Sequence, residues 1–295
     1  MANVGSPTGG KLTCATSSTD LNHMLGSTAT TGCLRVNRWT YNPESDLIDT
    51  TAFGASAITS ASNLSGLFNG SFDFEAMYPK IVTAASATTP RLGNSGLITF
   101  ASSSGKVTYA HEYELNFEFG EEDITDFIGT PVSVRKFKPL GLVRASGQWT
   151  TRHDSAATLP AVTAVNTGGA AATFKLTEDG TADVAITGSI VIPRGPSFTV
   201  DPRTGQIRAT YQFTFDGDAT AVAGDTLPCV FPAGTIDASD WDTNTDNTPD
   251  VTVVGTAVTG QTYTATGFLR SLRIRVAVGQ MIEVGGSIRL NGAVS

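Results

Sequence analysis

The chain has 295 residues, of which 40% are hydrophobic and 8% aromatic. That is enough apolar material for one large β domain or two small ones, and it excludes a disordered chain. No apolar stretch approaches the roughly 20 residues that a membrane-spanning helix needs, which excludes a helical membrane protein. The formal net charge of −8 has the wrong sign for tight binding of phosphates, although an acidic wall that lets DNA slide past is compatible with it.

The N-terminal region, residues 1–31, is rich in Ser, Thr and Gly and has no sustained apolar periodicity. Such a composition predicts a flexible N-terminal arm that becomes ordered only when a partner binds it. The first seven residues lack the basic segment and apolar core of a secretory signal, so we expect the chain to fold in a cytoplasm. The three cysteines, Cys14, Cys33 and Cys229, are an odd number at wide spacings and favour buried thiols over a disulfide framework or a zinc site.

Alternation of apolar and polar residues dominates the chain after this arm. In residues 107–119, aromatic and aliphatic side chains alternate with acidic ones, a period of two that gives a strand one apolar and one acidic face. Residues 208–215 repeat the pattern. Further strands with β-branched residues and Gly boundaries are predicted at residues 186–192, 251–258, 269–278 and 281–290. Only residues 64–68 and 121–128 have the character of short helices, so we predict an all-β fold with few of them.

Charge is distributed unevenly near the C-terminus. Between Arg208 and Arg270 there is no Lys or Arg, while aspartates accumulate, and the final segment is basic. One acidic and one basic strip allow copies of the chain to stack head to tail, which predicts Arg270, Arg273 and Arg275 as charge partners between subunits or rings. The alternative is that both strips are solvated and balance locally.

A first internal repeat links two distant segments. Asp49-Thr50-Thr51-Ala52-Phe53 recurs as Asp123-Ile124-Thr125-Asp126-Phe127, each after a strand-like run. Gly66-Leu67-Phe68 then follows the first copy as Gly141-Leu142-Val143 follows the second. Ordered matches of this kind indicate a duplicated unit. We predict that the two repeated turns contribute to assembly, through Asp49, Thr51, Phe53, Asp123, Thr125 and Phe127.

A second repeat follows in the C-terminal half. Residues 187–217 and 266–292 both read as two strands joined by a Gly-containing turn and ending at an Asx-Gly corner. The order is first half, first half, second half, second half. This order indicates either one domain inserted into another or copies that exchange strands. We assign residues 32–110 plus 218–295 to a first, discontinuous domain and residues 111–217 to a second.

These segments resemble the major tail tube proteins of long-tailed bacteriophages. The resemblance lies in the Trp-bearing strand Val36-Asn37-Arg38-Trp39-Thr40, the stretch from Asp49 to Phe53, and the closing strand, turn and strand of residues 266–292. It implies a tail-tube-like β-sandwich or barrel with duplicated, nested half-repeats. It also implies rings, either hexamers or pseudo-hexameric trimers of a duplicated chain, that stack into a conduit for DNA ejection. Residues 1–31 and 54–63 would then order on stacking.

Catalytic motifs are weak in this sequence. The three histidines, His23, His111 and His153, lie in no recognisable metal or nucleophile motif. Gly93-Asn94-Ser95-Gly96 is more typical of a plain turn than of a nucleophile loop. Glu121-Glu122-Asp123 offers paired carboxylates for acid–base work, but a solvated acidic turn is the better interpretation. We predict that the protein is not an enzyme.

One loop has the ligand types of a calcium site. Residues 242–250 place oxygen-bearing side chains at alternate positions, as calcium-binding loops do, with Asp242, Asn244, Asp246 and Asp250 as candidate ligands. The loop departs from the EF-hand form, because Asn247 stands where Gly is needed and Val253 where a bidentate Glu belongs. The alternative is an Asx-rich surface loop held by its own hydrogen bonds, with no cofactor.

Together these features predict a structural virion protein of a phage tail, which assembles with itself and with other tail proteins while DNA passes without specific binding. The expected location is the tail of the virion, with no membrane anchor. A capsid decoration protein or a tail-tip or hub ring component is the alternative within the same class. A calcium-dependent adhesive or carbohydrate-binding β module is the alternative from another class.

Overall fold

The structure is a computed structural model. It describes residues 11–14, 24–25, 34–49, 63–77, 96–100, 105–106, 110–125, 137–153, 170–176, 185–222, 234–236, 251–256, 261–291 and 294.

Most of the described residues belong to β-strands, which confirms the all-β prediction. The strands are β1 (Lys11–Cys14), β2 (Arg35–Asp49), β3 (Asn63–Met77), β4 (Leu97–Phe100), β5 (Gly105–Lys106), β6 (Ala110–Asp123), β7 (Phe137–His153), β8 (Ala170–Lys175), β9 (Ala185–Val191), β10 (Ser197–Val200), β11 (Ile207–Phe215), β12 (Thr220–Val222), β13 (Gly234–Thr235), β14 (Val251–Thr256), β15 (Thr262–Ala277) and β16 (Glu283–Asn291).

The short helices predicted from the sequence are wrong where the structure describes those residues. Residues 64–68 lie inside β3, and residues 121–123 form the end of β6. Both segments are held in long hairpins, in which pairing with a neighbouring strand overrides a weak local preference for helix.

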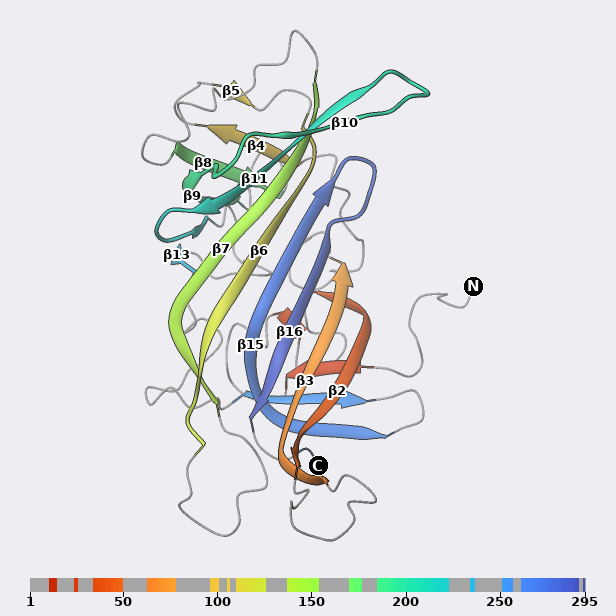
Figure 1. Ribbon diagram of the computed structural model, residues 1–295, viewed down its shortest axis with the longest axis vertical. Coiled ribbons are helices and arrows are strands. Elements are labelled where there is room, and N and C mark those ends of the chain that lie inside the picture. Colours follow the sequence, from red (N-terminus) through yellow and green to blue (C-terminus); the bar gives the residue numbers. More distant parts are fainter. Residues whose placement is uncertain are drawn as a thin grey trace, which may run out of the picture.

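The strands form one antiparallel sheet with the order β2-β3-β16-β15-β6-β7-β11-β9-β8-β4-β5. Figure 1 shows the long strands β7, β6, β15, β16, β3 and β2 lying side by side, while the shorter strands cross behind them near the two ends. β14 pairs with the first part of β15, and β8 pairs with β9. The sandwich or barrel description of this arrangement stays a prediction.

The hairpins β2–β3 and β6–β7 repeat each other. The register of the first shifts between Val36 and Arg38, and that of the second shifts between Ala110 and Glu112. A second pair of shifts lies between residues 45 and 47 in β2 and between residues 119 and 121 in β6. Each shifted position in β6 follows its counterpart in β2 by the same number of residues that separates Asp49 from Asp123. Related units tend to retain their bulges. The first-half repeat read from the sequence is therefore present in the sheet.

The second-half strands attach in the same order. β16 pairs with β3 and then with β15, and β11 pairs with β7 and then with β9 and β10. The turn before β16 holds Gly279 with φ of 78°, and the turn before β11 holds Gly205 with φ of 67°, a backbone conformation that favours Gly. Two units of matching strand order, β2-β3-β16-β15 and β6-β7-β11 with β9 and β10, thus lie next to each other and join where β15 pairs with β6.

Strand pairing also bears on the predicted domain division. Residues 97–106 and 220–235 fall in the ranges assigned to the first domain, yet β4 pairs with β8 and β12 pairs with β9 on the side of the second unit. The sheet itself continues through the β15–β6 junction. The boundaries of the two domains remain a prediction.

The inward face of the sheet holds an aromatic core. Trp149 is fully buried and stacks on Tyr211 with ring centroids 4.9 Å apart, and Phe174 from β8 stacks on Phe213 at 4.9 Å. The hydroxyl of Tyr113 donates to the carbonyl oxygen of Lys175 at 2.7 Å. Large aromatic side chains bury the most apolar area per residue, and stacked pairs add about 0.5–1.5 kcal/mol each. The core therefore fixes which face of every long strand points outward.

Candidate assembly surface

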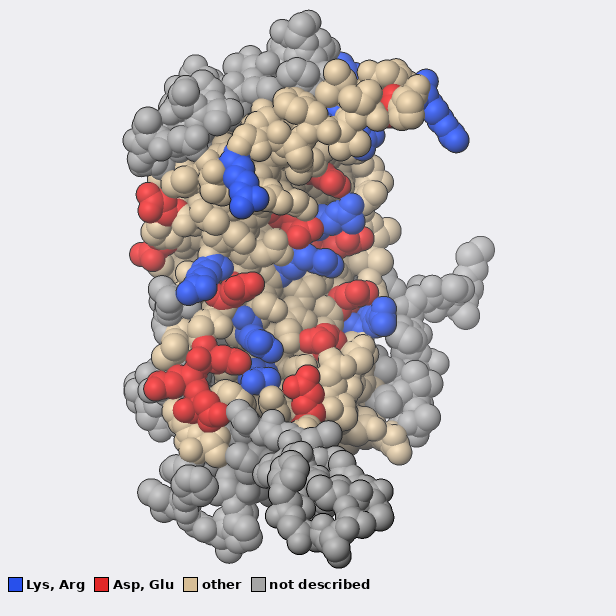
Figure 2. Space-filling view, in the orientation of Figure 1, with Lys and Arg blue, Asp and Glu red and all other residues tan. Residues whose placement is uncertain are grey.

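The outward face of the long strands is polar. We call it the polar sheet face. Figure 2 shows acidic and basic side chains interspersed over this face. Successive strand residues point to opposite sides, so the aromatic residues that fill the core leave the alternate positions to polar side chains. Its charged residues include Arg38, Asp73, Glu75, Glu112, Glu114, Glu118, Arg144, Arg273, Arg275 and Glu283.

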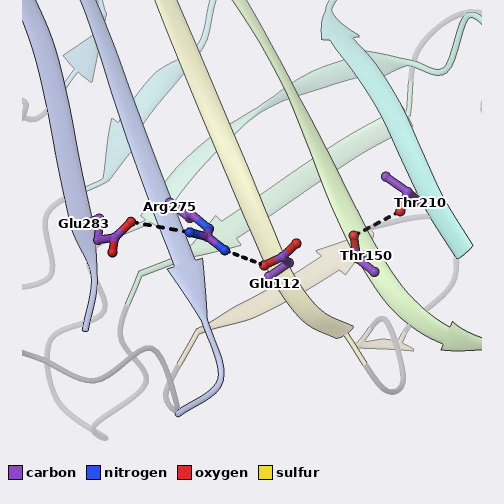
Figure 3. A network of polar contacts seen from close by, with 5 residues as sticks. All are labelled: Glu112, Thr150, Thr210, Arg275 and Glu283. Atoms are coloured by element: carbon purple, nitrogen blue, oxygen red, sulfur yellow. Dashed lines mark hydrogen bonds and ion pairs between the residues drawn. The ribbon is translucent and has the colours of Figure 1, made fainter. Parts of the chain in front are cut away.

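Arg275 forms the best-defined ion pair on this face. Its Nη2 lies 3.1 Å from Oε2 of Glu112 on β6, and its Nη1 lies 3.5 Å from Oε2 of Glu283 on β16. Figure 3 shows the guanidinium bridging the two carboxylates. The hydrogen bond to Glu112 and the neighbouring carboxylates raise the pKa of Arg275. The side chains are more than a third exposed, so such a pair contributes no more than about 1 kcal/mol, but it holds three strands in register.

The hydroxyls of Thr150 and Thr210 continue this row of cross-strand contacts, with their oxygens 3.1 Å apart on β7 and β11 (Figure 3). Opposite polar pairs of this kind stabilise a sheet by a few tenths of a kcal/mol each. The row runs from the first unit into the second, so the polar sheet face is continuous across the β15–β6 junction.

A shallow groove of about 520 Å³ opens on the polar sheet face, with Arg38, Glu75, Glu118 and Arg273 among its charged lining residues. Gly285 also lines the groove, and a Cβ added there would make ordinary van der Waals contact, 3.5 Å from the carbonyl oxygen of Phe74 and 3.7 Å from Nη2 of Arg273. Charges of both signs line the groove, so its shape and charge select no single class of ligand.

Asp73, in the wall of this groove, accepts two side-chain hydrogen bonds. Asp73 accepts a hydrogen bond from Oγ of Ser287 at 2.6 Å and another from the side-chain amide of Asn42. These contacts join β16, β3 and β2. The carboxylate of Asp73 therefore links the side chains of three neighbouring strands.

A second ion-pair cluster lies at the end of the β15–β6 junction and is much more buried. The guanidinium of Arg289 is only 10% exposed, and its Nη2 lies 3.3 Å from Oε1 of Glu121. The ring of Phe137 covers it, with the guanidinium carbon 4.1 Å from the ring centroid. Arg270 approaches the same carboxylate oxygen at 3.9 Å. The cluster ties β6 and β7 of one unit to β15 and β16 of the other.

This cluster corrects the interpretation of residues 121–123 as a solvated acidic turn. Glu122 and Asp123 are exposed, but Glu121 is partly buried against Arg289. The sequence holds no local signal for this contact, because the partner is brought in by a register that joins distant strands.

The predicted assembly residues are placed as follows. Asp123 Oδ1 accepts a hydrogen bond from the backbone N–H of Thr125 at 2.9 Å, which forms the side-chain-closed turn expected of this motif. Asp49 ends β2, opposite Asn63. The other predicted turn residues, Thr51, Phe53 and Phe127, lie outside the described residues.

The three arginines of β15 share one strand but have different surroundings. Arg270 and Arg275 have acidic partners within the chain, and Arg273 lies across Gly285. Their role between subunits stays a prediction. Asp242, Asn244, Asp246 and Asp250, the candidate calcium ligands, lie outside the described residues. Within the described part of the chain, no group of three or more His, Cys, Asp or Glu side chains is arranged to hold a metal ion.

Two strand edges were not singled out by the sequence. β2 stands at one end of the sheet order and, among the described strands, pairs only with β3. β10 projects with its turn beyond the body of the sheet (Figure 1) and pairs with β11. Its side chains Phe198 and Val200 are 56% and 58% exposed. The sequence signal that could have revealed this edge is the group Pro193, Gly195 and Pro196, which separates β9 from β10. The corresponding part of the other unit is the single strand β15.

A search with protein-family models matches none of them to this chain, and a search among curated proteins finds no similar sequence. In the part of the chain that the structure describes, no helix has both the length and the apolar character needed to cross a membrane.

Proposed function

We propose that this chain is a structural virion protein that assembles with itself into stacked rings, forming a bacteriophage tail tube through which DNA passes. One observation carries the proposal: two units of matching strand order pair edge to edge within one chain at the β15–β6 junction. A unit that joins its own duplicate through strand edges has the property that a ring of such units requires. Pairing between chains would also cover the edges of an otherwise open sheet, which are prone to uncontrolled association.

The charge pattern supports passage of DNA without specific binding. The net charge is −8, and Arg275 and Arg289 are already paired with carboxylates of the same chain. Arginines engaged in this way are poorly available to phosphates, because binding DNA would require breaking the existing pairs. The proposal includes no catalytic role. Its other partners are the tail proteins that would begin and end the tube.

The proposal is tested by negative-stain electron microscopy of the purified full chain, concentrated in moderate salt with and without calcium. We expect rings that stack into hollow filaments in both conditions. Dispersed particles of one chain at every concentration would contradict the proposal. Particles that remain small rings and never stack would favour a decoration or hub protein instead. Assembly or thermal stabilisation that appears only with calcium would favour the calcium-dependent module.

A further inference from the structure

We propose that β2 of one copy pairs antiparallel with β10 of a second copy, and so repeats between chains the junction that β6 and β15 form within the chain. This inference rests on the proposed self-assembly and names the strands and side chains that would carry it. Its partner is a second copy of this chain. The register of the internal β15–β6 junction, transferred to β10 and β2, gives the residues that would lie opposite each other.

The first step aligns β10 with the last part of β15. In the first unit Arg275 pairs with Glu283 at the start of β16, and in the second unit Thr199 pairs with Arg208 at the start of β11. In each pair the two strands are joined by a turn that holds a glycine with positive φ, Gly279 in the first unit and Gly205 in the second.

The two strand pairs also lie at the same level of their units, as the residues opposite them in the neighbouring strands show. Val284 of β16 faces Ala76, which faces Val36 at the first bulge of β2. Ala209 of β11 faces Thr151, which faces Ala110 at the first bulge of β6. By this alignment Phe198 occupies the place of Ile274, and Val200 occupies the place of Val276.

The second step aligns β2 with β6 through their bulges. Arg38 and Glu112 each follow the first bulge, so Trp39 takes the place of Tyr113 and Tyr41 takes the place of Leu115. Inside the chain Ile274 lies opposite Leu115, and Val276 lies opposite Tyr113.

The same register between two chains sets Phe198 of one copy opposite Tyr41 of the next, and Val200 opposite Trp39. Aromatic and β-branched residues in opposite positions are favourable cross-strand pairs.

Burial shows what the proposed contact would change. Ile274 and Val276 are 0% and 2% exposed in the internal junction, whereas Phe198 and Val200 are 56% and 58% exposed. At the other edge Trp39 and Tyr41 are partly buried. Their rings pack against Phe72 with centroids 5.6 and 5.4 Å away. A second copy would therefore place its exposed apolar side chains beside an ordered aromatic edge, and removing this area from water favours association.

Charge agrees with the same register. The residue after Val200 is Asp201, which takes the place of Ala277, and Ala277 lies opposite Glu112 in the internal junction. Asp201 of one copy would therefore lie opposite Arg38 of the next, and both are exposed. An exposed pair of this kind adds little affinity, but it favours this register over one in which like charges meet.

The two edges cannot meet each other within one chain. Along the sheet, β3, β16, β15, β6, β7 and β11 separate β2 from β10. At about 4.8 Å per strand this places the two edges roughly 30 Å apart along the sheet. Because the edges are different surfaces, the contact is head to tail, and repeating it gives a closed ring or a continuing filament.

The test is disulfide trapping of the full chain with the double variant Thr40→Cys, Thr199→Cys. These exposed residues lie opposite each other in the proposed register, since Thr40 takes the place of Glu114 and Thr199 that of Arg275. Directly opposite residues of antiparallel strands have Cβ atoms about 4.5–5.5 Å apart, close enough for a disulfide after a small adjustment. We expect covalent dimers, trimers and higher species on a non-reducing gel under mild oxidation.

Each single variant, Thr40→Cys or Thr199→Cys, has one engineered thiol and can give no chain longer than a dimer through it, and the wild-type chain reports on the native cysteines. The double variant Thr40→Cys, Ser197→Cys is the matched control for register, because its partner residue is displaced by two positions. We expect its yield of trimers and longer species to be at least about fivefold lower, since diagonal neighbours lie about 7–8 Å apart.

A second variant tests the apolar contact without cysteines. Val200→Glu changes an exposed residue of β10, and Val278→Glu changes a residue that is 50% exposed in the β15–β16 turn, away from both edges. We expect the first to weaken the apparent association constant by about tenfold or more and the second to leave it within about twofold, as centrally buried contacts dominate an interface. Circular dichroism of both variants checks that the fold is retained.

The outcomes separate this inference from the proposed function. Rings or tubes seen by electron microscopy without trimers or longer species from Thr40→Cys, Thr199→Cys would overturn the β2–β10 contact and leave the tail tube proposal standing. Equal yields from the register control would overturn the proposed register. A chain that stays monomeric by light scattering and forms no such species would contradict both proposals.

Discussion

The β15–β6 junction and the β10 edge present the same kind of strand in two situations. In the junction, β15 runs on as one strand and its apolar residues Ile274 and Val276 are covered by β6. At the edge, prolines precede the corresponding strand, and its Phe198 and Val200 are 56% and 58% exposed. One unit therefore buries the apolar side chains of this strand in the folded sheet, whereas the other leaves them more than half exposed. This difference means that equivalent substitutions should have opposite consequences.

The largest expected effect is on folding of the junction. Ile274→Ala removes a fully buried side chain and should lower the free energy of unfolding by about 2–5 kcal/mol, because it leaves a cavity that the sheet cannot close. Phe198→Ala at the corresponding edge position should lower it by less than about 1 kcal/mol. Urea denaturation at low protein concentration in the Val200→Glu background, in which association is expected to be weaker, measures both with a reduced contribution from assembly.

The same two substitutions, made in the wild-type background, test how each position contributes to assembly. There, Phe198→Ala should reduce assembly although it barely changes folding. Equal losses of unfolding free energy at the two positions would mean that the edge is already part of the folded core, and the contrast between junction and edge would be wrong.

The next largest effect concerns the two ion-pair clusters. Arg289→Ala removes a buried guanidinium that holds Glu121 and lies against Phe137. It should lower the free energy of unfolding by about 2–3 kcal/mol, since breaking a buried pair leaves a carboxylate with less compensation. Arg275→Ala on the exposed part of the polar sheet face should lower it by less than about 1 kcal/mol.

The salt dependence of unfolding sharpens this comparison of ion pairs. Raising the salt concentration should diminish the Arg275 effect and leave most of the Arg289 effect, because exposed pairs are screened far more than buried ones. Denaturant titrations at low and high salt measure both. An Arg289 contribution that disappears in high salt would show that this cluster is solvated.

Much of the sheet could be predicted from the sequence, because the signals are local. Alternation in residues 107–119 predicted β6, and the recurrence of Asp49 as Asp123 predicted two related hairpins whose bulges match. Strand order could not be derived, since the pairing of β3 with β16 joins residues at opposite ends of the chain. The short helices failed for the same reason: hairpin partners outweigh weak local preference.

The candidate surface was harder to predict than the fold. The arginines of β15 were singled out by composition, but one of the two partners of Arg275, Glu112, is 163 positions away and is set by register alone. Glu121 looked like part of a solvated turn because nothing near it in sequence indicates Arg289. β10 has the composition of an ordinary short strand, so only the structure reveals that its apolar side chains Phe198 and Val200 are more than half exposed.

The smallest expected effect lies in the turn that leads out of β10. Backbone and side-chain hydrogen bonds from Arg203 and Thr204 lower the pKa of Asp201, with the backbone N–H of Arg203 at 2.8 Å from Oδ1. A carboxyl whose pKa is lowered on folding stabilises the turn above its ordinary value of 3.8, and this stabilisation is lost as the pH falls through the lower folded value.

This pH dependence is measured best in the Val200→Glu variant, whose association is expected to be weaker than that of the wild-type chain. The amide proton of Gly205, whose N–H donates to the carbonyl oxygen of Asp201 at 2.8 Å, should report the loss of the turn by nuclear magnetic resonance at acid pH. Asp201→Asn keeps one acceptor oxygen but cannot titrate, so this part of the pH dependence should vanish. A carboxyl resonance of Asp201 that titrates at or above 3.8 would contradict the hydrogen-bonded turn. Because the turn carries β10, its loss should also weaken the β2–β10 contact, which would make tube assembly acid-sensitive while the β15–β6 junction stays intact.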